Sequence, residues 1–180
     1  MLTGGGSWHD DTMSSTRKRR VFEAGHRRKI LVIADESKEV EPALYFAASR
    51  ALHTNAAVVL LYVIEVENQF WGGVRAVQIE EESNKAKAVF RLLRRKISNE
   101  GFDTVDVEEV LREGKKVEEL LKLIDEDEDI AVLVLGAAVD VKGPGPLVSS
   151  LAAGSTAGKF PIPVTIVPGD LTLEDIKALA

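Results

Sequence analysis

Two glycine-containing turns near the C-terminal end carry the residues best suited to bind a ligand. Gly136 follows the apolar segment 130–135, and Gly154-Ser155-Thr156 lies eighteen residues further along, before a last apolar segment. In an open α/β sheet, ligands bind at the carboxyl ends of the strands, and a Gly-Ser turn that opens a helix offers backbone N–H groups to an anion. The two turns therefore predict a nucleotide pocket.

The loop between these turns is poorly equipped to hold a phosphate. It contains Gly143-Pro144-Gly145-Pro146, and proline has no backbone N–H to donate. Lys142, directly before it, offers a partial replacement because an ammonium group binds an anion as a point charge. We therefore expect a pocket whose chemistry is altered, with Lys142 and Gly143 as its loop residues.

Other arrangements that perform catalysis or bind metals find little support. The chain has no cysteine, which excludes a thiolate zinc site and a cysteine nucleophile, and its three histidines are too far apart in sequence to suggest a triad. The acidic run 125–129 is typical of a solvated connection at a helix end. Gly158-Lys159 is followed by Phe160, so it does not form a P-loop. We expect no metal site and at most a slow ATPase.

Composition limits the class of protein further. A chain of 180 residues that is 45% hydrophobic, with no internal repeat, fits one domain. The net charge of -6 disfavours a general nucleic-acid binder, because phosphate neutralisation requires an excess of Lys and Arg. No apolar run reaches the roughly 18 to 20 residues of a membrane span. No apolar segment resembling a secretory signal occurs near the start either. We expect a cytoplasmic protein.

The chain divides into three parts by composition. Residues 1–26 combine glycines, Ser, Thr and a basic cluster, which predicts a disordered tail. Residues 27–170 form the predicted domain, and residues 171–180 are predicted to form a short C-terminal helix or tail with Asp170 as its N-cap.

Apolar runs and helical periodicities alternate through the predicted domain. Strands are predicted at 29–34, 56–64, 105–110, 130–135 and 162–167. Helices are predicted from about 41 to 52, 77 to 99, 117 to 124 and 147 to 158. This alternation predicts an α/β fold with a single open, five-stranded, mainly parallel sheet and helices on both faces, as in Rossmann-like proteins. The alternating segment 105–110 is expected near a sheet edge, with Gly114 after it.

Several of these features occur together, in the same order, in one known family. They are Asp35 and Ser37 after the first strand, the segment 61–64, Arg112-Glu113-Gly114, the segment 129–136, Gly154-Ser155, and the segment 163–167. Over residues 28–168 the chain resembles the universal stress protein family. The resemblance implies an adenine nucleotide alpha hydrolase-like fold.

The resemblance also implies where a nucleotide would bind. In nucleotide-binding members the fourth strand ends in a glycine, followed by a second glycine and then a Gly-Ser or Gly-Thr pair. Gly136 and Gly154-Ser155 match the first glycine and the last pair, whereas Val139 stands at the middle glycine and the loop is five residues longer. Val139 and the prolines weaken the phosphate site, since close approach and N–H donors are lost.

The adenosine part of the pocket is assigned only through the resemblance. It implies that Asp35 meets the adenine or ribose and that Val63 lines the adenine slot. With Gly136, Lys142, Gly143 and the turn Gly154-Ser155-Thr156, these residues form the predicted site. The implied ligand is ATP, with Mg²⁺ only where ATP is bound.

Three functions stay open at this point. The first is a non-catalytic stress-response module for binding or signalling, acting as a homodimer through the final strand from Ile162 to Val167, which would be an unprotected edge in a monomer. The second is an ATP-binding switch or slow ATPase that uses the glycine loop. The third is an interaction protein that binds a protein client through the proline loop and Phe70-Trp71.

Overall fold

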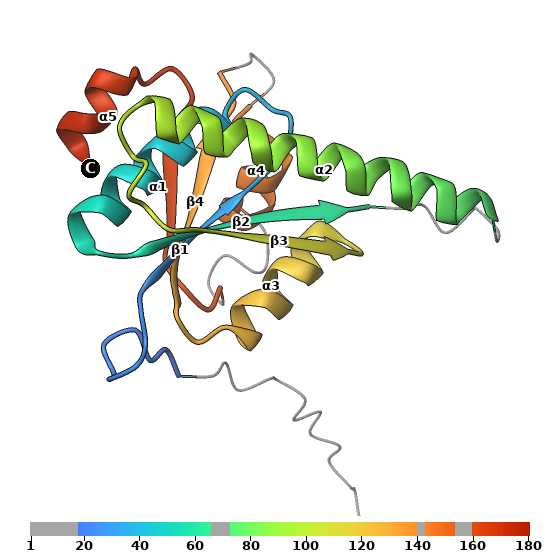
Figure 1. The fold of residues 1–180 in the computed structure, drawn as a ribbon, viewed down its shortest axis with the longest axis horizontal. Coiled ribbons are helices and arrows are strands. Elements are labelled where there is room, and N and C mark those ends of the chain that lie inside the picture. Colours follow the sequence, from blue (N-terminus) through green and yellow to red (C-terminus); the bar gives the residue numbers. More distant parts are fainter. Residues whose placement is uncertain (1–17, 66–72, 140–142, 154–159) are drawn as a thin grey trace, which may run out of the picture.

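The computed structural model describes residues 18–65, 73–139, 143–153 and 160–180, in which strands and helices alternate (Figure 1). The strands are β1 (Lys29–Ile33), β2 (Ala57–Ile64), β3 (Val107–Glu113), β4 (Ile130–Ala137) and β5 (Val164–Pro168). The helices are α1 (Val40–Thr54), α2 (Gly73–Asn99), α3 (Lys116–Glu126), α4 (Pro146–Ala153) and α5 (Leu173–Leu179). Within the described residues, every helix is too short or too polar to cross a membrane.

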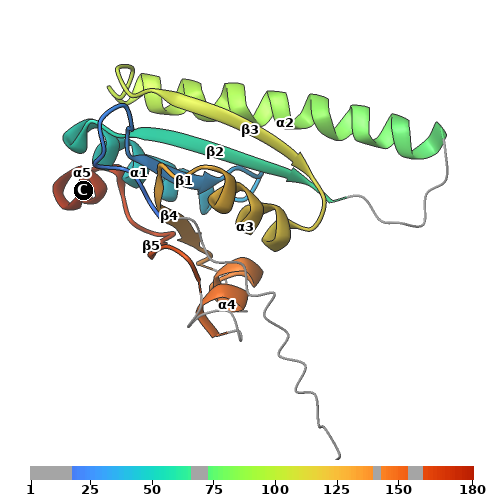
Figure 2. The same cartoon turned by 90° about the horizontal axis from the view of Figure 1, so that it is seen from below.

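The strands form one five-stranded sheet in the order β3-β2-β1-β4-β5, and every pairing is parallel. Helices cover both faces: α1, α2 and α5 lie on one, and α3 and α4 on the other (Figure 2). The predicted fold class is confirmed. After β3 the chain returns to the far side of β1 to form β4, so the order reverses between β1 and β4. Ligands of open α/β sheets bind at this reversal.

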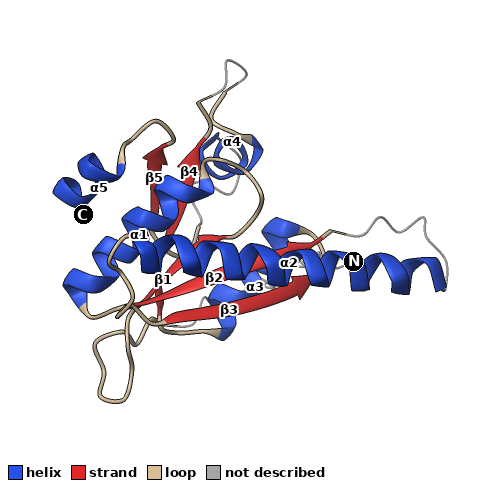
Figure 3. Ribbon diagram, turned by 45° about the horizontal axis from the view of Figure 1, so that its top comes forward, coloured by secondary structure: helices blue, strands red, loops and turns tan. Residues whose placement is uncertain are grey.

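The core consists of two apolar layers, one on each face of the sheet. All eight residues of β2 are buried, as expected for a strand covered on both sides. Alternate residues of β2 enter opposite layers: Tyr62 packs edge-to-face on Phe90 of α2, with ring centroids 6.3 Å apart, while Val63 faces the layer of α3 and α4. Figure 3 shows α1 and α2 crossing the same face of the sheet. The two layers hold the carboxyl ends of the central strands in place.

The observed boundaries differ from the predicted ones at several elements. Helix α2 begins at Gly73 rather than near 77, and α4 begins at Pro146, one residue before its predicted start, while residues 154–158 of the predicted helix lie outside the described residues. Strand β3 starts two residues later than predicted, and Gly114 follows its last residue as expected. The last strand runs from Val164 to Pro168 instead of beginning at Ile162.

The predicted N-cap of the C-terminal helix was wrong. Thr172, not Asp170, is the N-cap of α5, and its hydroxyl accepts a hydrogen bond from the backbone N–H of Asp175. The carboxylate of Asp175 in turn accepts from the backbone N–H of Thr172, at 3.2 Å. This reciprocal capping box needs a suitable side chain three residues after the cap, and Asp170 has Leu173 at that position.

Residues 18–26, within the predicted tail, contact the end of α3. The guanidinium group of Arg19 donates to the carbonyl oxygen of Asp127 at 2.8 Å. The backbone N–H of Arg20 donates to the carbonyl oxygen of Glu128 at 3.1 Å. The Nδ1 atom of His26 lies 2.6 Å from a carboxylate oxygen of Asp129. The N-terminal segment therefore contacts the acidic run 125–129 through the backbone carbonyls of Asp127 and Glu128 and the carboxylate of Asp129, while residues 1–17 lie outside the described residues.

Candidate functional site

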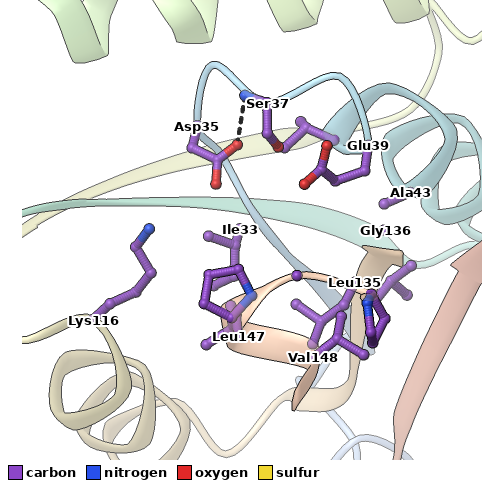
Figure 4. Close-up of a pocket in the computed structure, with 15 residues that line it drawn as sticks. Ile33, Asp35, Ser37, Glu39, Ala43, Lys116, Leu135, Gly136, Leu147 and Val148 are labelled. Atoms are coloured by element: carbon purple, nitrogen blue, oxygen red, sulfur yellow. Dashed lines mark hydrogen bonds between the residues drawn. The ribbon is translucent and has the colours of Figure 1, made fainter. Parts of the chain in front are cut away.

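A small cavity lies where β1 and β4 end, at the reversal of strand order (Figure 4). Its volume is about 80 Å³. Its polar side chains come from Asp35, Ser37, Glu39 and Lys116. Ligand sites usually measure roughly 300 to 1,000 Å³, so a nucleotide would require this cavity to widen.

Asp35 lies in the cavity wall and also shapes the turn that follows β1. Its Oδ1 atom accepts a hydrogen bond from the backbone N–H of Ser37 at 2.9 Å (Figure 4). This is the local bond by which an aspartate stabilises a turn. Asp35 thus has a structural role and a position from which it can meet a ligand.

Gly136 is required by the packing of α1 against β4. A Cβ atom at this position would lie 1.8 Å from the carbonyl oxygen of Glu39 and 2.6 Å from its carbonyl carbon. Glu39 is the N-cap residue of α1, and its backbone therefore approaches Gly136 more closely than any side chain would permit. Gly136 also lines the cavity, so its predicted ligand role stays a prediction beside this packing role.

The loop before α4 forms one wall of the cavity. Gly143 and Gly145 have φ angles of 111° and 98°, which favour glycine, and the backbone N–H of Ala138 donates to the carbonyl oxygen of Pro144 at 3.2 Å. Pro146 is the first residue of α4, where its missing N–H costs little. Pro144 and Pro146 both line the cavity, and neither has an N–H to offer a phosphate.

Of the remaining predicted site residues that the structure describes, neither Val63 nor Gly143 lines the cavity. Val63 is 7% exposed and packs in the apolar layer of α3 and α4, and it does not contribute to the described cavity wall. Lys142 and the turn Gly154-Ser155-Thr156 lie outside the described residues.

Lys116 is a cavity residue that the sequence reasoning missed. It is the first residue of α3, it is half-buried, and its side chain reaches along the cavity on the side of Asp35 (Figure 4). Its backbone N–H donates to a carboxylate oxygen of Glu65, after the end of β2, at 2.9 Å. The available signal was its place two residues after Gly114, because the carboxyl ends of parallel strands share one edge of the sheet.

A second, larger cavity lies on the other side of the turn between β1 and α1, against α2. It measures about 380 Å³ and shares Asp35, Ser37 and Val40 with the first. Two of its lysine side chains are paired: Lys85 lies 2.9 Å from Glu36, and Lys96 pairs with Glu41. The hydrogen bond with Glu36 raises the pKa of Lys85.

Comparison with protein families identifies the group to which this fold and site belong. The model of the universal stress protein family matches residues 26–168. The chain belongs to the universal stress protein family. The resemblance inferred from the sequence is thereby confirmed. No curated protein matches the chain.

Solved structures of universal stress proteins share the fold. UspA from Lactobacillus plantarum has a TM-score of 0.62 and 17% identity, covering 78% of this chain and 97% of that one. A universal stress protein solved with cAMP has a TM-score of 0.55 and 20% identity, covering 79% and 98%. One from Archaeoglobus fulgidus solved with dAMP has a TM-score of 0.53 and 20% identity, covering 77% and 96%.

The cavity of this universal stress protein has a distinctive set of charges. Asp35 and Glu39 contribute carboxylates to its wall, and Lys116 contributes the one ammonium group among the described lining residues. The described residues contain no cluster of three or more His, Asp and Glu that could hold a metal ion. This wall can accept hydrogen bonds and attract one anionic group, but its carboxylates repel a densely charged ligand.

Proposed function

We propose that this universal stress protein is a non-catalytic binding module whose cavity takes a nucleoside monophosphate in preference to ATP. The charge of the cavity wall carries this proposal: two carboxylates, from Asp35 and Glu39, face one ammonium group, from Lys116. Two universal stress proteins of the same fold were solved with cAMP and dAMP, which each contain a single phosphate.

A triphosphate fits this cavity less well than a monophosphate for two physical reasons. Each added phosphate brings negative charge toward the carboxylates of Asp35 and Glu39, and the Coulomb repulsion acts over several ångströms. The wall formed by Pro144 and Pro146 also lacks the N–H donors that hold extended phosphates elsewhere. A ligand must also widen the cavity beyond about 80 Å³, and a smaller ligand requires less displacement of the loop before α4.

Calorimetric titration of the purified full chain tests this preference. AMP, cAMP and ATP are compared, the last with and without Mg²⁺, after native mass spectrometry has shown that the protein is free of copurified nucleotide. We expect AMP to bind at least about tenfold more tightly than ATP, equivalent to about 1.4 kcal/mol. Tighter binding of ATP with Mg²⁺, or its hydrolysis, would instead support the alternative of an ATP-binding switch or slow ATPase. That alternative uses Asp35, Gly136, Lys142, Gly154 and Ser155.

A pair of matched variants locates the cause of the preference. Glu39→Gln removes a cavity carboxylate and should improve ATP affinity by about threefold, the size expected for one partly exposed charge. Glu36 lines the neighbouring cavity but not this one. Glu36→Gln removes the same charge and should leave ATP affinity unchanged. Equal effects of both variants would mean that net charge, rather than the cavity wall, sets the preference.

We further propose that the module is a homodimer that pairs through β5. This strand forms one edge of the sheet and has no charged side chain, and Ile166 on it is 43% exposed. An apolar cavity of about 340 Å³ adjoins it, lined by Phe160 and Ile162 as well as by strand residues. Pairing with a second copy would cover both. A protein client and a cytoplasmic location stay predictions.

A further inference from the structure

Lys116 and Lys38 are the described lysines near the carboxyl ends of the strands that make no ion pair with a described residue, and of the two only Lys116 lines the cavity at the ends of β1 and β4. Its neighbour Lys115 lies 3.0 Å from Glu118, and Lys85 lies 2.9 Å from Glu36. Lys116 makes no ion pair with any residue that the structure describes, although it is half-buried and lines the cavity. A half-buried ammonium group without a protein partner at a cavity is available to a ligand.

The base of Lys116 is held firmly, so its side chain reaches the cavity from a fixed point. Its backbone N–H bonds to Glu65 at 2.9 Å, and Leu120 and Ile124 anchor α3 to the sheet with no exposed surface. The turn before it is also fixed, because Gly114 has a φ of 146° and lies against the buried side chain of Glu119. This arrangement holds the side chain of Lys116 in the cavity wall, on the side of Asp35 (Figure 4).

We propose that Lys116 binds the phosphate of the nucleoside monophosphate, which makes α3 the source of phosphate recognition in this chain. The inference rests on the proposed function and specifies how the same cavity recognises its ligand. An ammonium group offers three N–H donors and a full charge, and it can replace the backbone donors that Pro144 and Pro146 lack. A single ammonium group matches a single phosphate, in agreement with the preference for a monophosphate.

Comparison of AMP with adenosine isolates the phosphate contribution. Calorimetric titration of the full chain should show tighter binding of AMP than of adenosine. In Lys116→Gln the affinity for AMP should fall about tenfold, the size of one charge-assisted hydrogen bond, while adenosine affinity stays within about twofold. Lys116→Arg should retain most of the preference for AMP. The preference should also weaken as salt is raised, because the side chain is only half-buried.

Two control variants distinguish the cavity from general electrostatics. Lys115→Gln removes the same charge one residue away, where the side chain is 81% exposed and paired with Glu118. Lys38→Gln removes a lysine that lines only the neighbouring cavity beside α2. Both variants should keep the wild-type ratio of AMP to adenosine affinity. Thermal unfolding of each variant confirms that it folds.

The other possible results of these titrations each overturn either the role of Lys116 or the proposed function. If wild type binds AMP more tightly than adenosine and Lys116→Gln keeps that ratio, the inference is wrong while the proposed function survives. Loss of the ratio in Lys38→Gln alone would place the phosphate in the cavity beside α2 and overturn the inference. An equal loss of AMP and adenosine affinity in Lys116→Gln would assign Lys116 a structural role instead. If wild type binds neither compound, the proposed function itself fails, and the inference with it.

Discussion

The two edges of the sheet are built in opposite ways. At the β3 edge, charged side chains pair with residues on other elements. These pairs are Lys29–Glu108, Arg94–Glu109, Arg112–Glu126 and Arg75–Glu113. At the β5 edge, the strand from Val164 to Pro168 has no charged side chain at all.

This difference indicates which edge is free to pair with another chain. Charges on an edge strand oppose the approach of a second strand, because pairing would strip them of water. Arg94 also donates to the backbone carbonyl of Val107 at the start of β3. This hydrogen bond occupies an acceptor that an added strand would otherwise use. The β3 edge is therefore protected by its side chains, whereas the described residues give the β5 edge no such protection, in agreement with the proposed dimer.

A charge placed on each edge should give the largest contrast. Ile166→Lys puts a charge into the proposed interface twice, once per copy, and should weaken the dimer by at least about a hundredfold, or about 2.7 kcal/mol. Leu111→Lys is the matched control on β3, since Leu111 is 38% exposed and Ile166 is 43% exposed. Analytical ultracentrifugation over a range of concentrations gives both dissociation constants.

The same pair of variants can refute the comparison. A dimer that survives Ile166→Lys must use another surface, and the apolar β5 edge would then need a different explanation. Dissociation by Leu111→Lys would show that the charged β3 edge is the interface.

The two halves of the sheet also differ in how helices and neighbouring strands are held to them. On the β5 side a close backbone contact joins α1 to β4, whereas on the β3 side the contacts are ion pairs between side chains. Gly136→Ala would place a Cβ atom 1.8 Å from the carbonyl oxygen of Glu39, so the start of α1 must move away from β4. We expect a loss of about 2 to 4 kcal/mol in the free energy of unfolding, measured by urea denaturation.

Gly73→Ala is the control for the glycine substitution. A Cβ atom at Gly73 has no neighbour within 4 Å, and Gly73 begins α2, where alanine favours the helix. Its effect should stay within about 0.5 kcal/mol of zero or be slightly stabilising. A similar loss in both variants would show that the contact between Gly136 and Glu39 is less tight than the geometry indicates.

The sequence predicted the features that depend on local pattern. The apolar run 56–64 identified β2, the alternation at 105–110 placed β3 at an edge, and Gly114 marked its end, because each signal lies within a few residues. The position of Asp35 at the cavity agrees with the family resemblance, which alone assigned this residue to the pocket.

Features that depend on contacts distant in sequence were not predictable in this way. The close approach of Glu39 to Gly136 joins residues almost a hundred positions apart, so no local pattern indicates this packing role of the glycine. The contact of Arg19 with the end of α3 also joins residues far apart in sequence, so no local pattern predicts it. A basic segment is usually solvated, and that was the expectation here. Lys116 was overlooked because a lysine at a helix start has no distinguishing pattern without the cavity beside it.

Removal of one charge from the β3 edge should have a small effect on stability and a visible effect on association. Glu109→Val removes the carboxylate partner of Arg94 but should cost less than about 1 kcal/mol, because the pair is partly exposed. The exposed edge then becomes more apolar, and concentration-dependent light scattering should rise. Glu118→Val on α3 removes a similarly paired carboxylate away from the edge and should leave scattering unchanged. Equal scattering of the two variants would refute the protective role of the edge charge.

Alkaline pH should give the smallest effect, through Lys29, which joins the β3 side to the end of α3. Burial lowers the pKa of Lys29, but hydrogen bonds with Glu108 and Asp127 outweigh this and raise it above its usual value of 10.5. Because the folded state binds this proton more tightly, the contribution of Lys29 to stability is complete below pH 10.5 and is lost as the pH rises through the folded pKa.

Urea denaturation of wild type and Lys29→Met between pH 8 and pH 11.5, roughly spanning the lysine pKa, tests this loss. The difference in unfolding free energy between them should be constant up to about pH 10 and shrink above it, as the wild-type ammonium group loses its proton. Both chains should carry Tyr45→Phe, because burial and the nearby Glu41 raise the pKa of Tyr45 to about 12, and its ionisation would overlap that of Lys29. A difference that stays constant across this range would mean that Lys29 stabilises the β3 side through packing of its aliphatic chain rather than through its charge.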